Sequence, residues 1–296
     1  MTARLERVRL GPVQLHGCTV VLRPPRFADH AAWRALRLRD RAFIEPFWLS
    51  SPLNWEQRHT KRAWVRECLE AAAEARGGRR LATVIEIDGL FAGQVEIGGI
   101  DARARHAEMG IWIDSHLARH GFGGVAAALL LDFGFDVLGL ERIVAPVSPA
   151  NVAAAHGAAQ VGYVREARMA QHFDVGGARS DHDLWAATRD DIPPKGFTER
   201  WIEHVLARRN GPVEQSMPTC GGMPGAAAIL LVEARFRAGE ARRFLRTVLP
   251  ARPVRLRVPG GPGAILRTLR PGDAAGWRAA RSNARALGAE SSSGTW

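Results

Sequence analysis

Apolar and polar residues alternate in short runs through the first two thirds of the chain, and these runs predict strands. The expected strands cover residues 20–23, 81–87, 90–100, 107–114, 143–147, 171–175 and 181–188. Asp88-Gly89 and Gly176-Gly177 each separate two such runs, and both pairs are typical of tight hairpin turns.

Between the strands the apolar spacing changes to that of helices. Asp29 is predicted to cap a helix that buries Trp33. Asn54, followed three residues later by Gln57, forms a capping-box pattern, which predicts a second helix that ends at Gly77. Two more helices are expected over residues 122–138 and 151–161.

A glycine-rich turn, residues 117–124, joins the strand 107–114 to the helix 122–138. Backbone N–H groups at a helix start lack intrahelical partners, and the helix dipole adds positive charge, so this turn predicts an anion site. A plain strand-to-helix connection that needs small residues explains the same pattern. Neither a P-loop nor the dinucleotide fingerprint is present in the sequence.

Further motifs follow in a fixed order. They are Gly110-Ile111-Trp112-Ile113-Asp114, Gly121-Phe122-Gly123, the segment 135–143 (FDVLGLERI), Pro149-Ala150-Asn151, Val161-Gly162-Tyr163 and Asp181-His182. In these motifs, over residues 20–188, the chain resembles the GNAT acyltransferases, and among them the RimJ/RimL type that acetylates protein N-termini. The resemblance implies an α/β (α+β) fold, with a mixed, mostly antiparallel sheet and helices on both faces, followed here by a C-terminal extension.

The resemblance also implies acetyl-CoA as cosubstrate and no metal. The residues expected to bind acetyl-CoA are Ile111, Ile113, Arg119, His120, Gly121, Phe122, Gly123, Gly124 and Asn151. Asn151 has an equally good and compatible role as the N-cap of the short helix. In this superfamily the strand around 109–113 splays from the next strand and offers backbone N–H groups to pantetheine and the thioester.

Acyl transfer to an amine requires a neutral nucleophile. Roughly 10–20% of an α-amino group is neutral at pH 7, so a weak base suffices. Glu108, where the family often places Glu, is the predicted base, and Glu96 is the reserve. The alternative is that Glu108 is a solvated strand residue.

Several positions depart from the family pattern. Ala154 replaces a Ser, Ala158 stands where many relatives carry a Tyr general acid, and Tyr163 occupies a position typical of the core. These departures leave open a degenerate acyl-CoA-binding protein with little activity.

The segment 39–48 resembles the family segment that walls the acceptor groove. Arg41, Phe47 and Trp48 are the expected acceptor-binding residues, although the two aromatic residues fit a plain core role as well. Asp181-His182 matches a family pair that a structural hydrogen bond explains equally well. The expected acceptor is a protein N-terminus, such as that of a ribosomal protein, with a small amine as the alternative.

Composition changes this picture little. Three scattered cysteines, no run of eighteen apolar residues and no signal peptide favour a cytoplasmic protein without membrane contact, either a monomer or a homodimer. The net charge is +11. Nearly all of it comes from Arg spread along the chain, so nucleic acid binding is not expected.

The last third differs from the rest. We expect an acetyltransferase domain over 1–208, a Gly/Pro/Ser-rich linker over 209–228 and an extension over 229–296 that begins with a helix to about residue 248. Residues 265–286 align without gaps on 21–42, with eleven identities that include Arg23/Arg267, Asp29/Asp273 and Trp33/Trp277. The extension is therefore interpreted as a truncated repeat without activity of its own, and chance similarity of two Arg/Ala-rich helices is the alternative.

Overall fold

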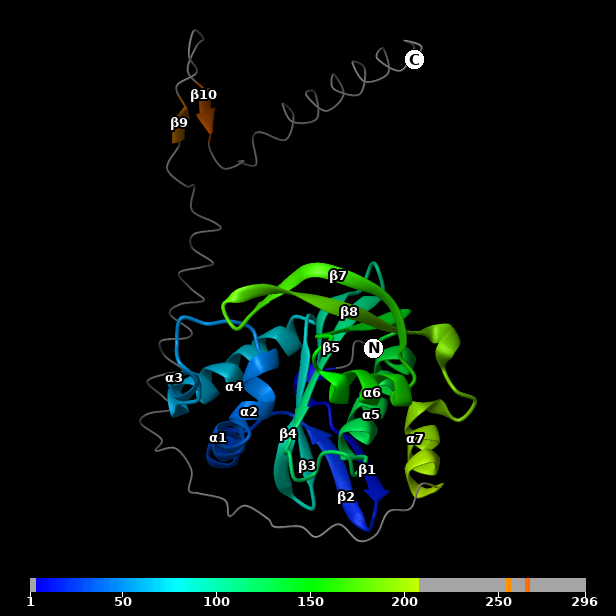
Figure 1. Cartoon of the computed structure of the whole chain (residues 1–296). Helices are drawn as coiled ribbons and strands as arrows, with labels where there is room; N and C mark the ends of the chain where they lie inside the picture. The colour runs from blue at the N-terminus through cyan, green and yellow to red at the C-terminus, as the bar shows by residue number, and fades with distance from the viewer. Residues whose placement is uncertain (1–3, 208–253, 257–263, 267–296) are drawn as a thin grey trace, which may run out of the picture. The chain divides into compact units, whose positions relative to one another are not determined.

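An eight-stranded mixed sheet forms the centre of residues 4–207 (Figure 1). The structure, a computed structural model, describes residues 4–207, 254–256 and 264–266. The strand order is β1-β2-β3-β4-β5-β6-β8-β7, and every neighbouring pair is antiparallel except β5 and β6. The strands are β1 (Leu10–Leu15), β2 (Cys18–Arg23), β3 (Leu81–Ile87), β4 (Leu90–Asp101), β5 (His106–Ile113), β6 (Arg142–Val147), β7 (Val164–Val175) and β8 (Ala178–Thr188).

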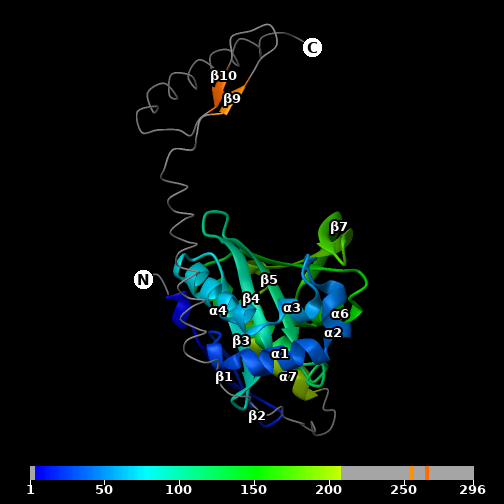
Figure 2. The same cartoon turned by 90° about the vertical axis from the view of Figure 1, so that its left-hand side faces the viewer.

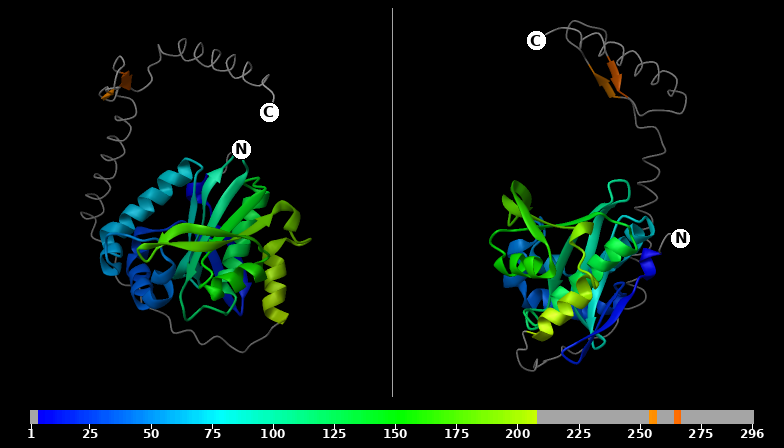
Figure 3. Two further views of the ribbon diagram at one scale, coloured as in Figure 1. Left: turned by 45° about the horizontal axis from the view of Figure 1, so that its top comes forward. Right: turned by 90° about the vertical axis from the view of Figure 1, so that its right-hand side faces the viewer.

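Helices cover both faces of this sheet. They are α1 (His30–Arg39), α2 (Arg41–Ile44), α3 (Trp55–Arg58), α4 (Lys61–Arg76), α5 (Phe122–Asp136), α6 (Val152–Val161) and α7 (Gly196–Ala207). The first four lie on one face, toward the viewer in Figure 2, and the last three lie on the other, seen on the right of Figure 3. The predicted fold class, a mixed and mostly antiparallel sheet with helices on both faces, is confirmed.

Two apolar clusters fill the spaces on either side of the sheet. α5 is buried almost all round, with Phe122, Leu130 and Phe135 inaccessible to solvent, so its sequence is apolar rather than amphipathic. On the other face, Trp33 of α1 and Trp64 of α4 pack with their ring centroids 4.8 Å apart. Helices are therefore packed against both faces of the sheet through apolar side chains.

The helix predicted from Asn54 to Gly77 is in fact two helices. Asn54 and Gln57 make the predicted capping box, with hydrogen bonds of 2.9 and 3.0 Å, but this box opens only α3. The chain then leaves helical geometry at His59, and the Thr60 hydroxyl accepts from Ala63 N to begin α4. The prediction failed because a second cap, hidden inside an apolar helical pattern, interrupts the first helix.

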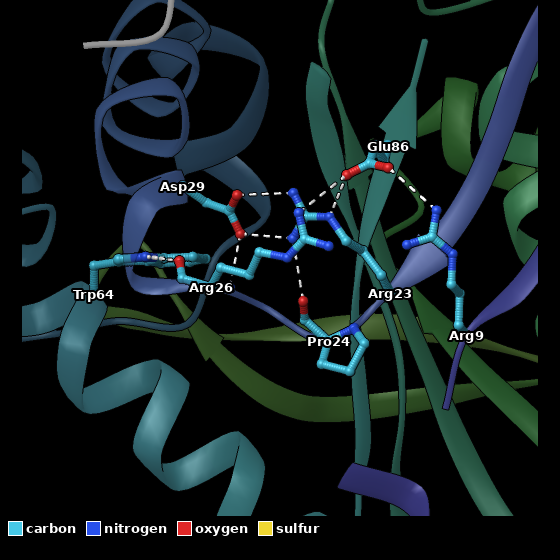
Figure 4. A network of polar contacts seen from close by, with 7 residues as sticks. All are labelled: Arg9, Arg23, Pro24, Arg26, Asp29, Trp64 and Glu86. Atoms are coloured by element: carbon cyan, nitrogen blue, oxygen red, sulfur yellow. Dashed lines mark hydrogen bonds and ion pairs between the residues drawn. The ribbon is translucent and has the colours of Figure 1, made fainter. Parts of the chain in front are cut away.

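Asp29 precedes α1 as predicted, yet its side chain does not cap that helix. Its carboxylate accepts two hydrogen bonds of 2.8 Å from the Arg23 guanidinium and one of 2.7 Å from Arg26 N (Figure 4). Arg23 also pairs with Glu86 of β3, and Arg9 lies 3.7 Å from the same carboxylate. The buried Arg23 is thus fully paired, and the network ties β2 to β3 and to the start of α1.

Two further differences concern the ends of this part. β1, which pairs with β2 through Leu10 and Leu22, was not among the expected strands. α7 follows the predicted elements and packs against α5, where the Asp132 carboxylate accepts from Phe197 N and Thr198 N at the start of α7.

The chain divides into two compact units, Met1–Glu233 and Ala234–Trp296. The second contains an antiparallel pair, β9 (Val254–Leu256) and β10 (Ala264–Leu266). In this pair Val254 is paired with Leu266, and in the first unit Leu10 is paired with Leu22. Val254 and Leu266 each lie 244 positions after Leu10 and Leu22, respectively. The expected linker 209–228, the helix 229–248 and most of the repeat 265–286 lie outside the described residues.

Candidate active site

The two parallel strands of the sheet separate after a short contact. β5 and β6 pair only through His106–Arg142, Ala107–Ile143 and Glu108–Val144. Beyond these pairs β5 continues to Ile113 against β4 alone, and β6 continues to Val147 against β8 alone. The backbone groups of residues 109–113 on the β6 side therefore have no strand partner, and an extended ligand with amide groups can pair with them.

The start of α5 lies at the end of this splayed strand. The first helical hydrogen bond runs from Val125 N to Gly121 O at 3.0 Å, so the N–H groups of residues 121–124 have no acceptor within the helix. Gly121 has φ 89°, a left-handed conformation that favours glycine. Four N–H groups without helical acceptors at the positive end of a fifteen-residue helix are suited to bind an anion.

Two glycines of the turn serve packing against α7. A Cβ on Gly124 would lie 2.0 Å from the Trp201 ring, and one on Gly121 would lie 2.9 Å from Val205. The Trp201 indole also donates to Gly121 O at 2.8 Å. Because these two glycines have no side chain, Trp201 and Val205 of α7 pack directly against the backbone of the turn.

Gly123 faces the other way. A Cβ there would meet only Ile113 at 3.7 Å and Ile111 at 3.9 Å, both ordinary contact distances. Ile111 is 44% exposed in the splay. Gly123 is therefore the glycine of the turn whose side borders the space between β5 and β6.

The other predicted residues of the turn occupy different surroundings. Arg119 and His120 are exposed, and the His120 carbonyl accepts from the His16 ring at 3.1 Å. Phe122 is fully buried and packs edge-on against His16, with ring centroids 6.1 Å apart. Only the backbone N–H of Phe122 is thus available to a ligand.

Glu108 lies on the face of β5 that α1 and α4 cover, together with Gly110 and Trp112. Glu96 of β4 pairs with Gly110 and accepts from Arg80 Nε at 3.0 Å. Glu108 is exposed at the surface, yet partial desolvation raises the pKa of its carboxyl, and the charge of Glu96 raises it further. A carboxylate with a raised pKa beside the splayed strand is suited to accept a proton from an amine.

Asn151 and Tyr163 have partners within the protein. Asn151 Oδ1 accepts from Ala154 N at 3.1 Å and so caps α6. The buried Tyr163 hydroxyl donates to the sulfur of Met109 at 3.4 Å, and burial raises the pKa of this phenol.

Of the three predicted acceptor residues, Arg41 begins the short helix α2, and Phe47 and Trp48 end the turn that follows it. Arg41 is exposed and pairs with Glu45 and Glu56, so its guanidinium is occupied. Phe47 and Trp48 are half-buried. Trp48 stacks on the guanidinium of Arg37, with Cζ 3.8 Å from the ring centre.

The hairpin β7–β8 is fastened to this segment. Ser50 N donates to Asp174 O at 2.9 Å, the Ser50 hydroxyl donates to the Asp174 carboxylate at 2.6 Å, and Gly177 N donates to the same hydroxyl at 2.6 Å. Leu49 forms a bridge with Val175. The hairpin and the loop after α2 therefore form one continuous wall on the side of Trp48.

The Asp181-His182 pair serves the hairpin itself. His182 is buried, its Nδ1 donates to Ser180 O at 3.0 Å, and its ring meets Phe173 edge-on. The Asp181 carboxylate accepts from Gln171 N at 2.9 Å.

Sequence reasoning missed two residues, Arg37 and Ser50. Arg37 belongs to the buried stripe of α1 with Trp33 and Leu36, and a charged residue on an apolar helix face was the available signal. Ser50 carried no signal, because its partner lies 124 residues away.

Within the residues that the structure describes, no group of three or more His, Cys, Asp or Glu is placed to hold a metal ion. Over the same part of the chain, no helix is both long and apolar enough to span a membrane.

Comparison with known proteins identifies related sequences and folds. A sequence model described as an acetyltransferase (GNAT) domain matches residues 19–164. The solved structure of Mycobacterium smegmatis RimJ in complex with CoA-disulfide is 35% identical, with a TM-score of 0.65, and the match covers 68% of this chain and 96% of that one.

Other matches are less similar or cover less of the chain. Ribosomal-protein-S5-alanine acetyltransferase from Vibrio fischeri is 21% identical, with a TM-score of 0.53 over 59% of this chain and 96% of that one, which shows the fold alone. The spermidine N(1)-acetyltransferase of Escherichia coli K12 is 34% identical over 94 residues, which are 32% of this chain. The chain thus matches half the length of this curated relative.

Proposed function

Because the chain belongs to the acetyltransferase (GNAT) family, we propose that it transfers an acetyl group from acetyl-CoA to the α-amino group of a protein N-terminus. The observation that carries this proposal is the splay of β5 from β6 directly before the unpaired N–H groups of residues 121–124. The similarity to a RimJ over nearly its whole length supports the choice of acceptor.

The splay and the turn fit the two ends of an acyl-CoA. Pantetheine contains amide groups, which would pair with the free backbone of residues 109–113, beside Ile111 and Ile113. The pyrophosphate would accept from the N–H groups of residues 121–124, where the open side of Gly123 permits close approach. Arg119, exposed at the rim, adds a positive charge.

Glu108 would act as the general base. It accepts a proton from the incoming ammonium, directly or through water, and the neutral amine then attacks the thioester carbonyl. The new C–N bond forms as the C–S bond breaks, and the second amine proton goes to the departing thiolate by way of solvent. Backbone N–H groups of the splayed strand would stabilise charge on the carbonyl oxygen.

Tyr163 takes no part in this proposal, because its hydroxyl is buried against Met109. A thiol with a pKa near 8.5 is an adequate leaving group without a dedicated acid. The alanines at 154 and 158 are therefore compatible with turnover.

The acceptor would enter between β5 and the wall formed by Trp48, Ser50 and the β7–β8 hairpin. An N-terminal peptide, including that of a ribosomal protein, is the proposed acceptor. A polyamine is the second candidate, supported by the partial match to a spermidine acetyltransferase.

Thiol release from acetyl-CoA, measured with the full chain and a peptide that begins with Ala, tests the proposal. The same peptide with its amine already acetylated is the control. We expect thiol release and a 42 Da gain only with the free amine. Absence of turnover with peptides and with spermidine would favour the degenerate, inactive alternative.

A further inference from the structure

Arg37, in the last turn of α1, is buried without a hydrogen-bond partner on two of its nitrogens. Only 3% of its surface is exposed, and Nε and Nη1 reach neither solvent nor an acceptor. Arg23 is equally buried, at 3%, yet it is paired with Asp29 and Glu86. Buried guanidinium groups are normally satisfied in this way, so the unpaired donors of Arg37 require an explanation.

Two aromatic rings lie against this guanidinium. Its Cζ lies 3.8 Å from the ring centre of Trp48 and 4.5 Å from that of Trp112. Stacking stabilises the cation through the faces of the rings, but it leaves the N–H groups, which lie in the guanidinium plane, without acceptors.

The two carboxylates whose charge acts on Arg37, those of Glu67 and Glu96, already have other partners. Glu67 accepts from the Gln94 amide at 2.7 Å, and Glu96 accepts from Arg80. Neither carboxylate is hydrogen-bonded to Arg37. Burial has the largest effect and lowers the pKa of Arg37 to about 9, although the charge of each carboxylate raises it. The protein therefore supplies no oxygen to Nε and Nη1.

Arg37 lies on the same side of the sheet as the proposed base. Trp112, which it stacks on, follows Glu108 by four residues on one face of β5, a span of about 13 Å. Gly110 lies between them, and a Cβ there would meet only Cγ of Glu96, at 3.7 Å. Gly110 therefore places no side chain on this face of β5 between Glu108 and Trp112.

We propose that Arg37 is an anchoring site for a carbonyl or carboxylate oxygen of the acceptor, which enters beside Trp48 and accepts from Nε and Nη1. This inference rests on the proposed function and specifies its substrate class. An extended peptide rises about 3.3 Å per residue, so a main-chain carbonyl of its first few residues reaches Arg37 when the amine is at Glu108.

The same site disfavours polyamines. Spermidine has no oxygen to accept from Arg37, and its own charges are repelled by the buried cation. Arg37 would therefore select peptide acceptors over polyamines by a hydrogen bond that only the peptide can make.

Replacement of Arg37 by Met tests this, because Met keeps much of the volume and lacks the donors. R34M, on the exposed side of the same helix, is the control. The probes are Ala-Ala-Ala-Ala amide and spermidine, each titrated into the full chain saturated with CoA and each assayed for thiol release with acetyl-CoA.

We expect R37M to weaken binding of the tetrapeptide about 10- to 100-fold, with no loss for spermidine and no decrease in Tm. R34M should change none of these. If Arg37 only supports packing, R37M will instead lower Tm and affect both acceptors alike, which would overturn the inference. Absence of thiol release by the parent chain would contradict the proposed function, and the binding titration would still decide the role of Arg37.

Discussion

At the scale of single residues, the site depends on how each charged side chain is surrounded. Glu108 and Glu96 are near neighbours on one sheet face, but only Glu96 has an arginine partner, Arg80. The unpaired carboxyl, whose pKa is raised, is the better proton acceptor of the two. This difference favours Glu108 over Glu96 as the proposed base.

Replacement of Glu108 by Gln should lower kcat about 100- to 10,000-fold, since it removes the base. The rise of the parent rate with pH that reflects deprotonation of Glu108 should disappear in the variant, whereas the affinity for acetyl-CoA should not change. Steady-state kinetics across pH check this. E70Q, on the exposed side of α4, is the control, and unchanged kcat in E108Q would exclude the base role.

His59 should make stability depend on pH. It is buried beside Trp55, and desolvation lowers its pKa to about 4. The unfolded chain therefore binds the proton first, and the free energy of unfolding should fall as pH drops from about 6.5 to 4, by at most ~1.4 kcal/mol per pH unit. Denaturant unfolding of H59Q should show a smaller slope in that range, and an identical slope would contradict the assignment.

At the scale of elements, the sequence predicts local structure better than contacts between distant segments. The hairpin at Asp88-Gly89 follows from local turn chemistry: both residues have positive φ in the structure. The break at His59 was missed because a second cap within an apolar pattern resembles an ordinary polar pair. The Ser50–Asp174 contact joins segments far apart in the chain, so no local pattern encodes it.

The contact between Ser50 and the β7–β8 hairpin should matter for the acceptor and not for acetyl-CoA. S50A removes the hydroxyl that bonds Asp174 and Gly177 N. Loss of about 1 kcal/mol should lower Tm by about 2–4 °C and raise KM for a peptide several-fold.

The neighbouring S51A is the control, because that hydroxyl only accepts from Leu53 N within its own loop. Equal effects of the two variants on peptide KM would argue against a wall made by the hairpin.

At the scale of the whole molecule, the described core and every candidate site residue lie between residues 5 and 201. All of them fall within the domain proposed for residues 1–208, and one β9–β10 pair, Val254–Leu266, corresponds to Leu10–Leu22 of β1–β2. A chain that ends at residue 208 should keep the affinity of the full chain for acetyl-CoA. Calorimetric titration of both chains checks this, and a loss of binding would assign the extension a part in the site.

The anion site at the start of α5 is the central claim, and isothermal titration of acetyl-CoA into the full chain tests it most directly. G123E is the matched variant, because its Cβ fits beside Ile111 and Ile113 and places a carboxylate where the pyrophosphate should bind. We predict micromolar binding that G123E weakens at least about 100-fold without loss of fold. Equal affinity in the two folded proteins, or no binding in the parent, would contradict the account.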